Sequence, residues 1–300
     1  HLRTRRQRQM CIRDSTSATT IYGSEANFTA LLTDETNNQI DIDSQNLTVN
    51  SGTLTVDNAN LLGATTSGKV TATIATTETV TELATLSADG GTNDLTVVIR
   101  AADATAATAA QLNTINAATA VAVNLTNVTA LAGSTLADLG TLATAIGNSE
   151  FSNATGLTTI AVTDTTVDAT TLATRIDSYD SINGGSTTGM TLASGATIEV
   201  EAGEIAEMLA DETAGRLTIG DQLITVNGAI TVDNANLLGA TTTGKVTATI
   251  LTSESVTELA TLNEDGGVNA FTIIISASDA TSSTAAQLNT INDAVSASVV

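Results

Sequence analysis

Residues 52–86, GTLTVDNANLLGATTSGKVTATIATTETVTELATL, return as residues 228–262, GAITVDNANLLGATTTGKVTATILTSESVTELATL. The match continues to residues 116 and 292 with a constant offset, the one that separates Asp57 from Asp233. Self-similarity of this kind is typical of proteins in which each repeat packs against its neighbours. The duplicated stretch therefore predicts a repeat fold.

The similarity also extends upstream, from Ile21 in the first copy and Ile198 in the second, with an offset that is longer by a single position. We predict a first copy over about residues 21–197 and a second copy over about residues 198–300. Since the second copy stops in mid-repeat, we expect a truncated C-terminus. Residues 16–300 are treated as a single repeat solenoid.

Each copy contains a shorter repeat, in which a β-branched run is followed by a turn and a helical pattern. Val70, Leu95 and Val121 begin three successive runs at almost equal spacing. The expected strands are residues 70–74, 95–99, 121–125, 158–162, 197–200, 223–226, 246–250 and 271–275. Strand, helix and strand at such a short period require parallel pairing with right-handed crossovers.

Helix starts are marked by polar capping residues. Thr79 with Glu82, and Ser255 with Glu258, have the spacing of a capping box. Another helix is expected from Ser134. Three aspartates are expected to cap further helices, and three glycine pairs to end the helical segments. These are Asp103, Asp168 and Asp279, and residues 90–91, 184–185 and 266–267.

One such repeat has too few large apolar side chains to offset the entropy lost on ordering its backbone, so neighbouring repeats must cover it. We therefore predict an α/β fold, a right-handed repeat solenoid with a parallel β-sheet on one side and short helices on the other. A parallel β-helix with short helical insertions is the alternative.

The first fifteen residues, HLRTRRQRQMCIRDS, differ in composition from the rest of the chain. They hold five of the ten basic residues, the only His and the only Cys. This stretch, MCIRDS above all, resembles translated sequencing-adaptor read-through. We therefore interpret residues 1–15 as a non-native, disordered segment, with a basic nucleic-acid-binding arm as the alternative.

The remaining residues are strongly acidic. One of the thirty-two acidic residues lies in residues 1–15, so the remainder has five basic and thirty-one acidic side chains, a net charge of −26. So few cations cannot neutralise a row of phosphates, which argues against nucleic acid and anionic membranes as partners. No apolar run approaches the length of a membrane span, so membrane insertion is not expected.

The same remainder lacks His, Cys, Trp and Pro. No nucleophile paired with His can be assembled, and zinc, copper or iron sites built on imidazole or thiolate are excluded. We expect no catalytic residue and no enzyme activity. Carboxylate and carbonyl oxygens remain, and these suit calcium.

Two related loops are candidates for that calcium. Residues 89–94, DGGTND, and residues 264–269, EDGGVN, combine oxygen ligands with flexible glycines. The candidate metal ligands are Asp89, Asp94 and Asp265. Ala270 replaces Asp94 in the second copy, and a plain turn between helix and strand is the alternative interpretation.

Two other patterns are weaker. Thr71 and Thr73 lie on one face of an expected strand, as in ice-binding solenoids, but the adjacent strands do not extend the threonine array. Carboxylate pairs such as Glu204 with Glu207, and Asp211 with Glu212, have the residue type of sugar-cleaving sites. Because only five aromatic residues are present, we interpret these pairs as a solvated acidic helix face.

The strings AQLNTIN, VTALAGSTLADL and VTELATL resemble the Thr/Ala/Asp-rich repeats of giant surface-associated or exported proteins of marine bacteria, cyanobacteria in particular. The resemblance covers nearly all of residues 21–300. It implies a secreted or cell-surface protein with a structural or adhesive role, whose partners are neighbouring repeats of the same polypeptide and glycans or a cell surface. A calcium-stabilised module that binds glycans or another cell's surface is the alternative function.

Overall fold

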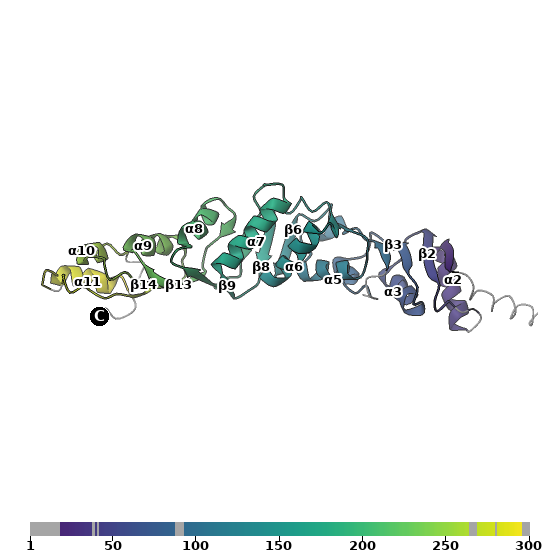
Figure 1. Cartoon of the computed structure of the whole chain (residues 1–300), viewed down its shortest axis with the longest axis horizontal. Coiled ribbons are helices and arrows are strands. Elements are labelled where there is room, and N and C mark those ends of the chain that lie inside the picture. Colours follow the sequence, from purple (N-terminus) through teal and green to yellow (C-terminus); the bar gives the residue numbers. More distant parts are fainter. Residues whose placement is uncertain are drawn as a thin grey trace, which may run out of the picture. The chain divides into compact units, whose positions relative to one another are not determined.

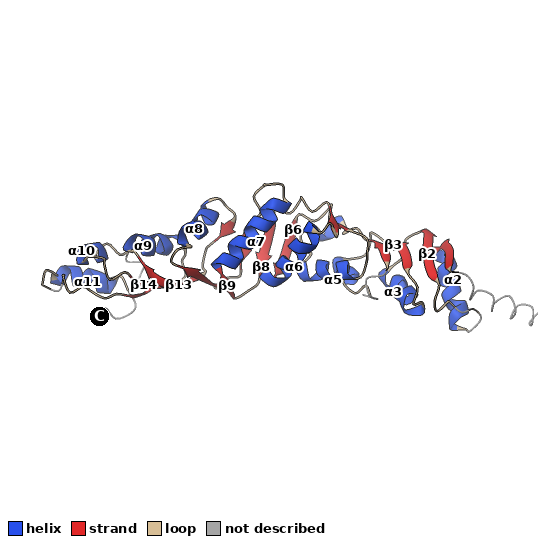
Figure 2. Ribbon diagram, viewed as in Figure 1, coloured by secondary structure: helices blue, strands red, loops and turns tan. Residues whose placement is uncertain are grey.

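The computed structural model describes residues 19–37, 40, 42–87, 93–263, 269–279 and 281–295. These residues form two compact units, residues up to 132 with 137–157, and residues 133–136 with those from 158 onward. Helices and strands alternate along both units (Figure 1), and the strands pair into several parallel sheets (Figure 2). The chain is therefore an α/β protein, as the sequence predicted. The interpreted non-native segment, residues 1–15, lies outside the described residues.

The first unit contains strands, α-helices and one short 3₁₀-helix. Its strands are β1 (Thr20–Ser24), β2 (Asn46–Ser51), β3 (Val70–Thr73), β4 (Asp94–Thr96), β5 (Val123–Asn124), most of β6 (Ala130–Ser134) and β7 (Phe151–Ser152). Its helices are α2 (Glu25–Thr36), α3 (Val56–Thr65), α4 (Val80–Leu83), η2 (Ala101–Asp103), α5 (Ala109–Ala117) and nearly all of α6 (Leu136–Gly147). Strands β1 to β4 form a parallel sheet in sequence order, and β5 pairs in parallel with β7.

The second unit continues the alternation of strands and helices. Its strands are β8 (Thr159–Val162), β9 (Thr166–Asp168), β10 (Gly189–Leu192), β11 (Thr197–Glu201), β12 (Leu217–Thr218), β13 (Leu223–Ile230), β14 (Val246–Ile250) and β15 (Ala270–Thr272). Its helices are α7 (Ala169–Ile182), α8 (Ile205–Thr213), α9 (Val232–Thr241), α10 (Val256–Leu259) and α11 (Ala285–Asp293).

Two sheets run through this second unit. One has the order β15-β14-β13-β11-β9, and the other has β12-β10-β8 followed by β6, whose last residues belong to this unit. Strands β8 and β9, like β10 and β11, are separated by only a few residues yet join different sheets.

The sequence predicted one strand for each repeat. The segments around α7 have two, because short strands such as residues 166–168 contain too few residues for a period-2 pattern to stand out.

Parallel pairing joins each strand to one that lies a single repeat away in the sequence. The paired positions are closest in sequence at Ala229 and Thr249 and furthest apart at Thr166 and Thr197. The spacing expected from the sequence, that of Val70 and Leu95, falls within this range. The strands turn alternate side chains inward, so Val70 and Ala72 are buried while Thr73 is exposed.

Several helix starts follow the sequence closely. Thr79 and Ser255 form complete capping boxes with Glu82 and Glu258, at the starts of α4 and α10. The Asp168 carboxylate accepts a hydrogen bond from the Thr171 amide at the start of α7, as predicted. Gly184 and Gly185 follow α7 with positive φ angles, which end the helix. The other two glycine pairs, at 90–91 and 266–267, lie outside the described residues.

The predictions for Asp103 and Asp279 were wrong. Helix α5 begins after Thr108 and α11 after Thr284, whose hydroxyls accept the N-terminal amide hydrogen bonds. The Asp103 carboxylate instead accepts a hydrogen bond from the backbone N–H of Val80, 2.7 Å away at the start of the preceding helix α4.

Two other aspartates bind the start of a preceding helix in the same way. Asp279 Oδ2 lies 3.2 Å from the Val256 amide of α10, and Asp164 Oδ2 lies 2.7 Å from the Leu136 amide of α6. The predicted start of this last helix at Ser134 is also slightly too early. Each aspartate therefore caps a helix one repeat upstream. Sequence spacing alone suggests a cap for the nearest helix that follows.

Candidate functional site

The calcium candidates are only partly within the described residues. Asp94 opens β4, and its carboxylate lies 2.5 Å from the Lys69 ammonium group. Asp89 and Asp265 lie outside the described residues. Within the part of the chain that the structure describes, no group of three or more His, Cys, Asp or Glu side chains is placed to hold a metal ion. The calcium site stays a prediction.

The threonines on the sheet of the first unit form only short rows. Thr48 lies beside Thr71 in the register, but Asp94 follows in the same row. Thr73 pairs with Thr96. An ice-binding surface requires the same residue over many neighbouring strands. The row of Thr48 and Thr71 ends after two strands, at Asp94.

Acidic side chains and one arginine lie together between α7 and α8 in the second unit. Helix α7 buries Leu172, Ile176 and Tyr179 at helical spacing, which fixes its orientation on the sheet. Helix α8 buries Ile205, Met208 and Asp211, at the spacing of one helix face. Glu207 and Asp211 of α8 line the space between the two helices.

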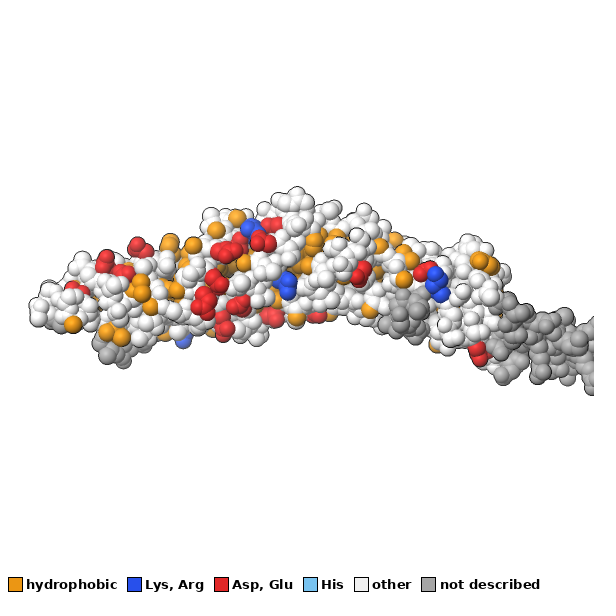
Figure 3. Space-filling model, in the orientation of Figure 1, with side chains coloured by type: hydrophobic (Ala, Val, Ile, Leu, Met, Phe, Trp, Pro, Cys, Tyr) orange, Lys and Arg blue, Asp and Glu red, His pale blue; other side chains and the backbone are white. Residues whose placement is uncertain are grey.

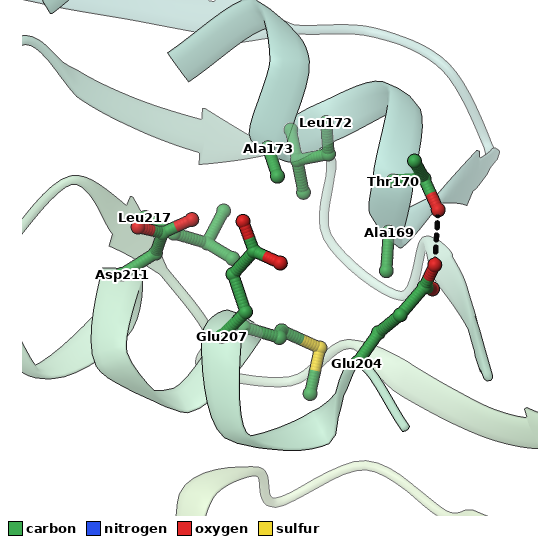
Figure 4. Close-up of a pocket in the computed structure, with 9 residues that line it drawn as sticks. Ala169, Thr170, Leu172, Ala173, Glu204, Glu207, Asp211 and Leu217 are labelled. Carbon is green, nitrogen blue, oxygen red and sulfur yellow. Dashed lines mark hydrogen bonds between the residues drawn. The ribbon is translucent and has the colours of Figure 1, made fainter. Parts of the chain in front are cut away.

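The two helices enclose a small hollow (Figure 4). It is lined by Ala169, Thr170, Leu172, Ala173, Glu204, Glu207, Met208, Asp211 and Leu217. The Thr170 hydroxyl donates a hydrogen bond of 2.5 Å to Glu204, which joins the start of α7 to the start of α8. The hollow measures about 10 Å³, which is space for about one water molecule.

Arg216 binds three carboxylates beside this hollow. Its guanidinium forms ion pairs with Asp177 and Asp180 on α7 and with Asp211 on α8. The Asp180 and Asp211 pairs measure 2.8 Å and 3.0 Å between nitrogen and oxygen. Asp180 also accepts a hydrogen bond from the Thr188 amide, so the network ties both helices to the turn after α7.

Asp211 is the buried carboxyl group of this network. Desolvation raises the pKa of the Asp211 carboxyl, and Arg216 only partly offsets it. The sequence interpretation of Asp211 as part of a solvated helix face was therefore wrong, since its side chain is 7% exposed. Glu207, by contrast, is exposed. The sequence analysis does not predict this network, although the i,i+3 spacing of Asp177 and Asp180 and the isolated Arg216 are signals for it.

Acidic side chains also gather on the surface of the second unit around α7 and α8 (Figure 3). Asp168 on β9 and Glu199 on β11 are direct neighbours in the parallel register, and both are exposed. Glu201, further along β11, points to the same face. Like charges on adjacent strands repel one another, so this face has an electrostatic cost.

The hollow between α7 and α8 offers little chemistry beyond binding water. Sugar cleavage requires two carboxyl groups on opposite sides of a sugar ring, and about 10 Å³ cannot admit one. None of the described residues that line it is aromatic. The arrangement serves better as a link between two helices, because one guanidinium is shared by three carboxylates from both of them.

Comparison with known proteins identifies no relative. No protein-family model matches the chain, and neither a curated protein nor a solved structure does. Among the described helices, none combines the length and the apolar character needed to cross a membrane.

Proposed function

We propose that the chain is a right-handed repeat solenoid that serves as a structural and adhesive segment of a large exported or cell-surface protein. One observation carries the proposal: hydrogen bonds between successive repeats recur in both copies. The Asn60 side-chain amide donates to the Thr85 carbonyl at 2.8 Å, and its oxygen accepts from the Ser87 amide at 2.8 Å. Asn236 makes the same two bonds in the second copy.

Strand edges are joined in the same way. The Val70 amide donates to Asn93 Oδ1 at 3.0 Å, and at the equivalent place in the second copy the Val246 amide donates to Asn269 Oδ1 at 2.9 Å. In these contacts a side chain of one repeat satisfies a backbone N–H group of the neighbouring repeat. A repeat that depends on its neighbour for hydrogen bonds and for burial suits a protein built by adding repeats.

The adhesive part of the proposal is supported by charge. The chain beyond residue 15 carries −26, and the second unit places Asp168, Glu199 and Glu201 on one exposed face. Such a surface keeps a long polypeptide soluble and attracts cations and cationic groups. The proposal assigns no catalytic activity to the chain.

Surface display tests this function. The chain is placed between a cell-surface anchor and a reporter domain, and binding of the cells to glycan-coated and cationic surfaces is measured. We expect binding that weakens as salt is added, and a reporter that survives protease treatment. A variant with Glu199→Thr and Glu201→Thr, exposed residues on β11, is the control for charge. Rapid proteolysis within the chain would contradict the structural role.

The alternative function, a calcium-stabilised module that binds glycans or another cell's surface, is distinguished by thermal melting. Calcium binding to the folded state would raise the melting temperature, and EDTA would lower it. Asp94→Ala is the matched control, because Ala270 occupies the equivalent position in the second copy. An EDTA effect that Asp94→Ala abolishes would favour the calcium module over the proposal made here.

A further inference from the structure

Helices α5 and α11 are equivalent positions of the two copies with almost identical sequences. Residues 109–117 read AAQLNTINA and residues 285–293 read AAQLNTIND. Both helices begin with the same capping box, formed by Thr108 with Gln111 and by Thr284 with Gln287. A difference in their surroundings therefore reflects what packs against them, since their own side chains are almost the same.

One face of α11 is uncovered where α5 is buried. Leu112 is 0% exposed, whereas its equivalent Leu288 is 39% exposed. Ala109 is buried and Ala285 is exposed. Ile291, one turn further along the same stripe of α11, stays 0% exposed, like Ile115 in α5. The difference in cover is therefore confined to the N-terminal part of this stripe, at Ala285 and Leu288.

The structure shows what covers α5 within the first unit. The Asn113 amide donates to the Asp138 carbonyl of α6 at 3.0 Å, and the Asn116 amide donates to Glu150 at 2.5 Å. The Ala132 amide donates to the Ala107 carbonyl at 2.8 Å, just before α5 begins. The cover is therefore the next repeat along the chain, residues 119–152. The equivalents of the two asparagines, residues 289 and 292, are exposed in α11.

The segments that follow β4 and β15 differ in burial in the same way as the two helices. After β4, the Ile99 amide donates to the Asn124 carbonyl at 3.1 Å, and Ile99 is 0% exposed. Its equivalent Ile275 is partly exposed, and the neighbouring Ile274 is 47% exposed. Exposed apolar side chains therefore occur on α11 and on the segment that follows β15.

We propose that this uncovered surface, formed by Ile275, Ala285 and Leu288 and named here the α11 face, is a docking surface for a further repeat with the chemistry of residues 119–152. The inference rests on the proposed solenoid and names its partner. The occupant follows from the duplication, because a nearly identical helix is already covered by that segment in the first copy. Its apolar side chains, such as Leu125 and Leu139, are buried there.

A graft tests the proposal directly. Residues 119–157 are appended after Ala294, which is equivalent to Ala118, and hydrogen exchange of the α11 amides is followed by mass spectrometry. We expect exchange of α11 to slow by about tenfold or more, toward the rate measured for α5 in the same molecule. The control graft carries Leu125→Asp and Leu139→Asp and should leave α11 at its original rate.

Paired substitutions keep the test independent of how well the graft folds. In the original chain, Leu112→Asn should accelerate exchange of α5 strongly, while Leu288→Asn should change α11 little. In the grafted chain, Leu288→Asn should become as damaging as Leu112→Asn. If Leu288→Asn is already as damaging in the original chain, the α11 face is covered by something else and the proposal fails.

Two further outcomes would also overturn it. A dimer of the original chain in sedimentation, dissociated by Leu288→Asn, would make a second copy the occupant. Unchanged α11 exchange in a folded graft would show that the repeat does not dock. Exchange around Asn60 and Asn236 reports separately on the solenoid: if those amides are unprotected, the proposed function fails, whereas protected amides with an unoccupied α11 face refute only this inference.

Discussion

Replacing Gly68 by alanine should separate two neighbouring repeats of the first unit. A Cβ atom at this position would lie 2.3 Å from the Gln45 carbonyl oxygen and 2.5 Å from its carbon. Both are backbone atoms, which cannot rotate away. Since real Cβ atoms essentially never approach closer than 3.0 Å, the two segments must move apart to accept the methyl group.

The cost can be worked out from what that movement disturbs. Overpacking of a tight contact costs about 1–3 kcal/mol. The Thr66 hydroxyl bonds to the Gln45 carbonyl at 2.7 Å, and the Leu47 amide bonds to the Lys69 carbonyl at 2.8 Å. Weakening these adds about 1 kcal/mol. We expect a local destabilisation of about 3 kcal/mol, which corresponds to about a hundredfold loss of protection.

Hydrogen exchange is the suitable assay, because a protein built as the proposed repeat solenoid need not unfold in one step. Amides of β2 and β3 should lose protection in Gly68→Ala. Gly244→Ala should act likewise on the second copy, where a Cβ would lie 2.3 Å from the Gln222 carbonyl oxygen. Gly147→Ala is the control. No atom outside its own stretch of helix lies within 4 Å of that Cβ, so alanine should stabilise the end of α6 by up to about 1 kcal/mol. Unchanged protection in Gly68→Ala would refute the close approach of the two repeats.

Two other predictions use the capping groups. A hydrogen bond from the backbone of Thr79 lowers the pKa of Glu82, so the stability this carboxylate contributes is present above its ordinary pKa and lost as pH falls through the lowered value. The hydrogen-exchange protection of the α4 amides, corrected for intrinsic exchange, should therefore fall as the pH is lowered. Glu82→Gln should make this protection less dependent on pH. A variant with the same pH dependence as the original chain would contradict the prediction. Asp103→Ala should destabilise α4 by about 2–3 kcal/mol, because the buried Val80 amide and the Arg100 guanidinium lose a charged partner. Asp279→Ala should destabilise α10 by about 1 kcal/mol. If hydrogen exchange shows that Asp103→Ala destabilises α4 by no more than Asp279→Ala destabilises α10, the contact between Arg100 and Asp103 does not stabilise α4.

Much of the candidate site lay beyond sequence reasoning. The i,i+3 and i,i+7 spacing of Glu204, Glu207 and Asp211 was visible, but not that Asp211 is buried. That outcome depends on Arg216, which follows α8 and reaches back to Asp177 and Asp180 on α7. A pattern within one helix cannot reveal a partner that approaches from the turn beyond the next helix. The capping boxes at Thr79 and Ser255 were predictable, because all their groups lie within a single helical turn.

The amino-acid sequence was sufficient for the duplication, the approximate length of the repeat, the parallel pairing of strands such as Val70–Thr73, and the local caps. These depend on residue order and on contacts over a few residues. Folding in three dimensions was needed to assign Asp103 to the helix before it rather than the helix after it, and to bury Leu112 while exposing Leu288. Both outcomes depend on contacts between segments that no pattern within one helical turn connects, Val80 with Asp103 and residues 119–152 with α5. Almost identical helices can therefore differ in burial, because burial is decided by what packs against them.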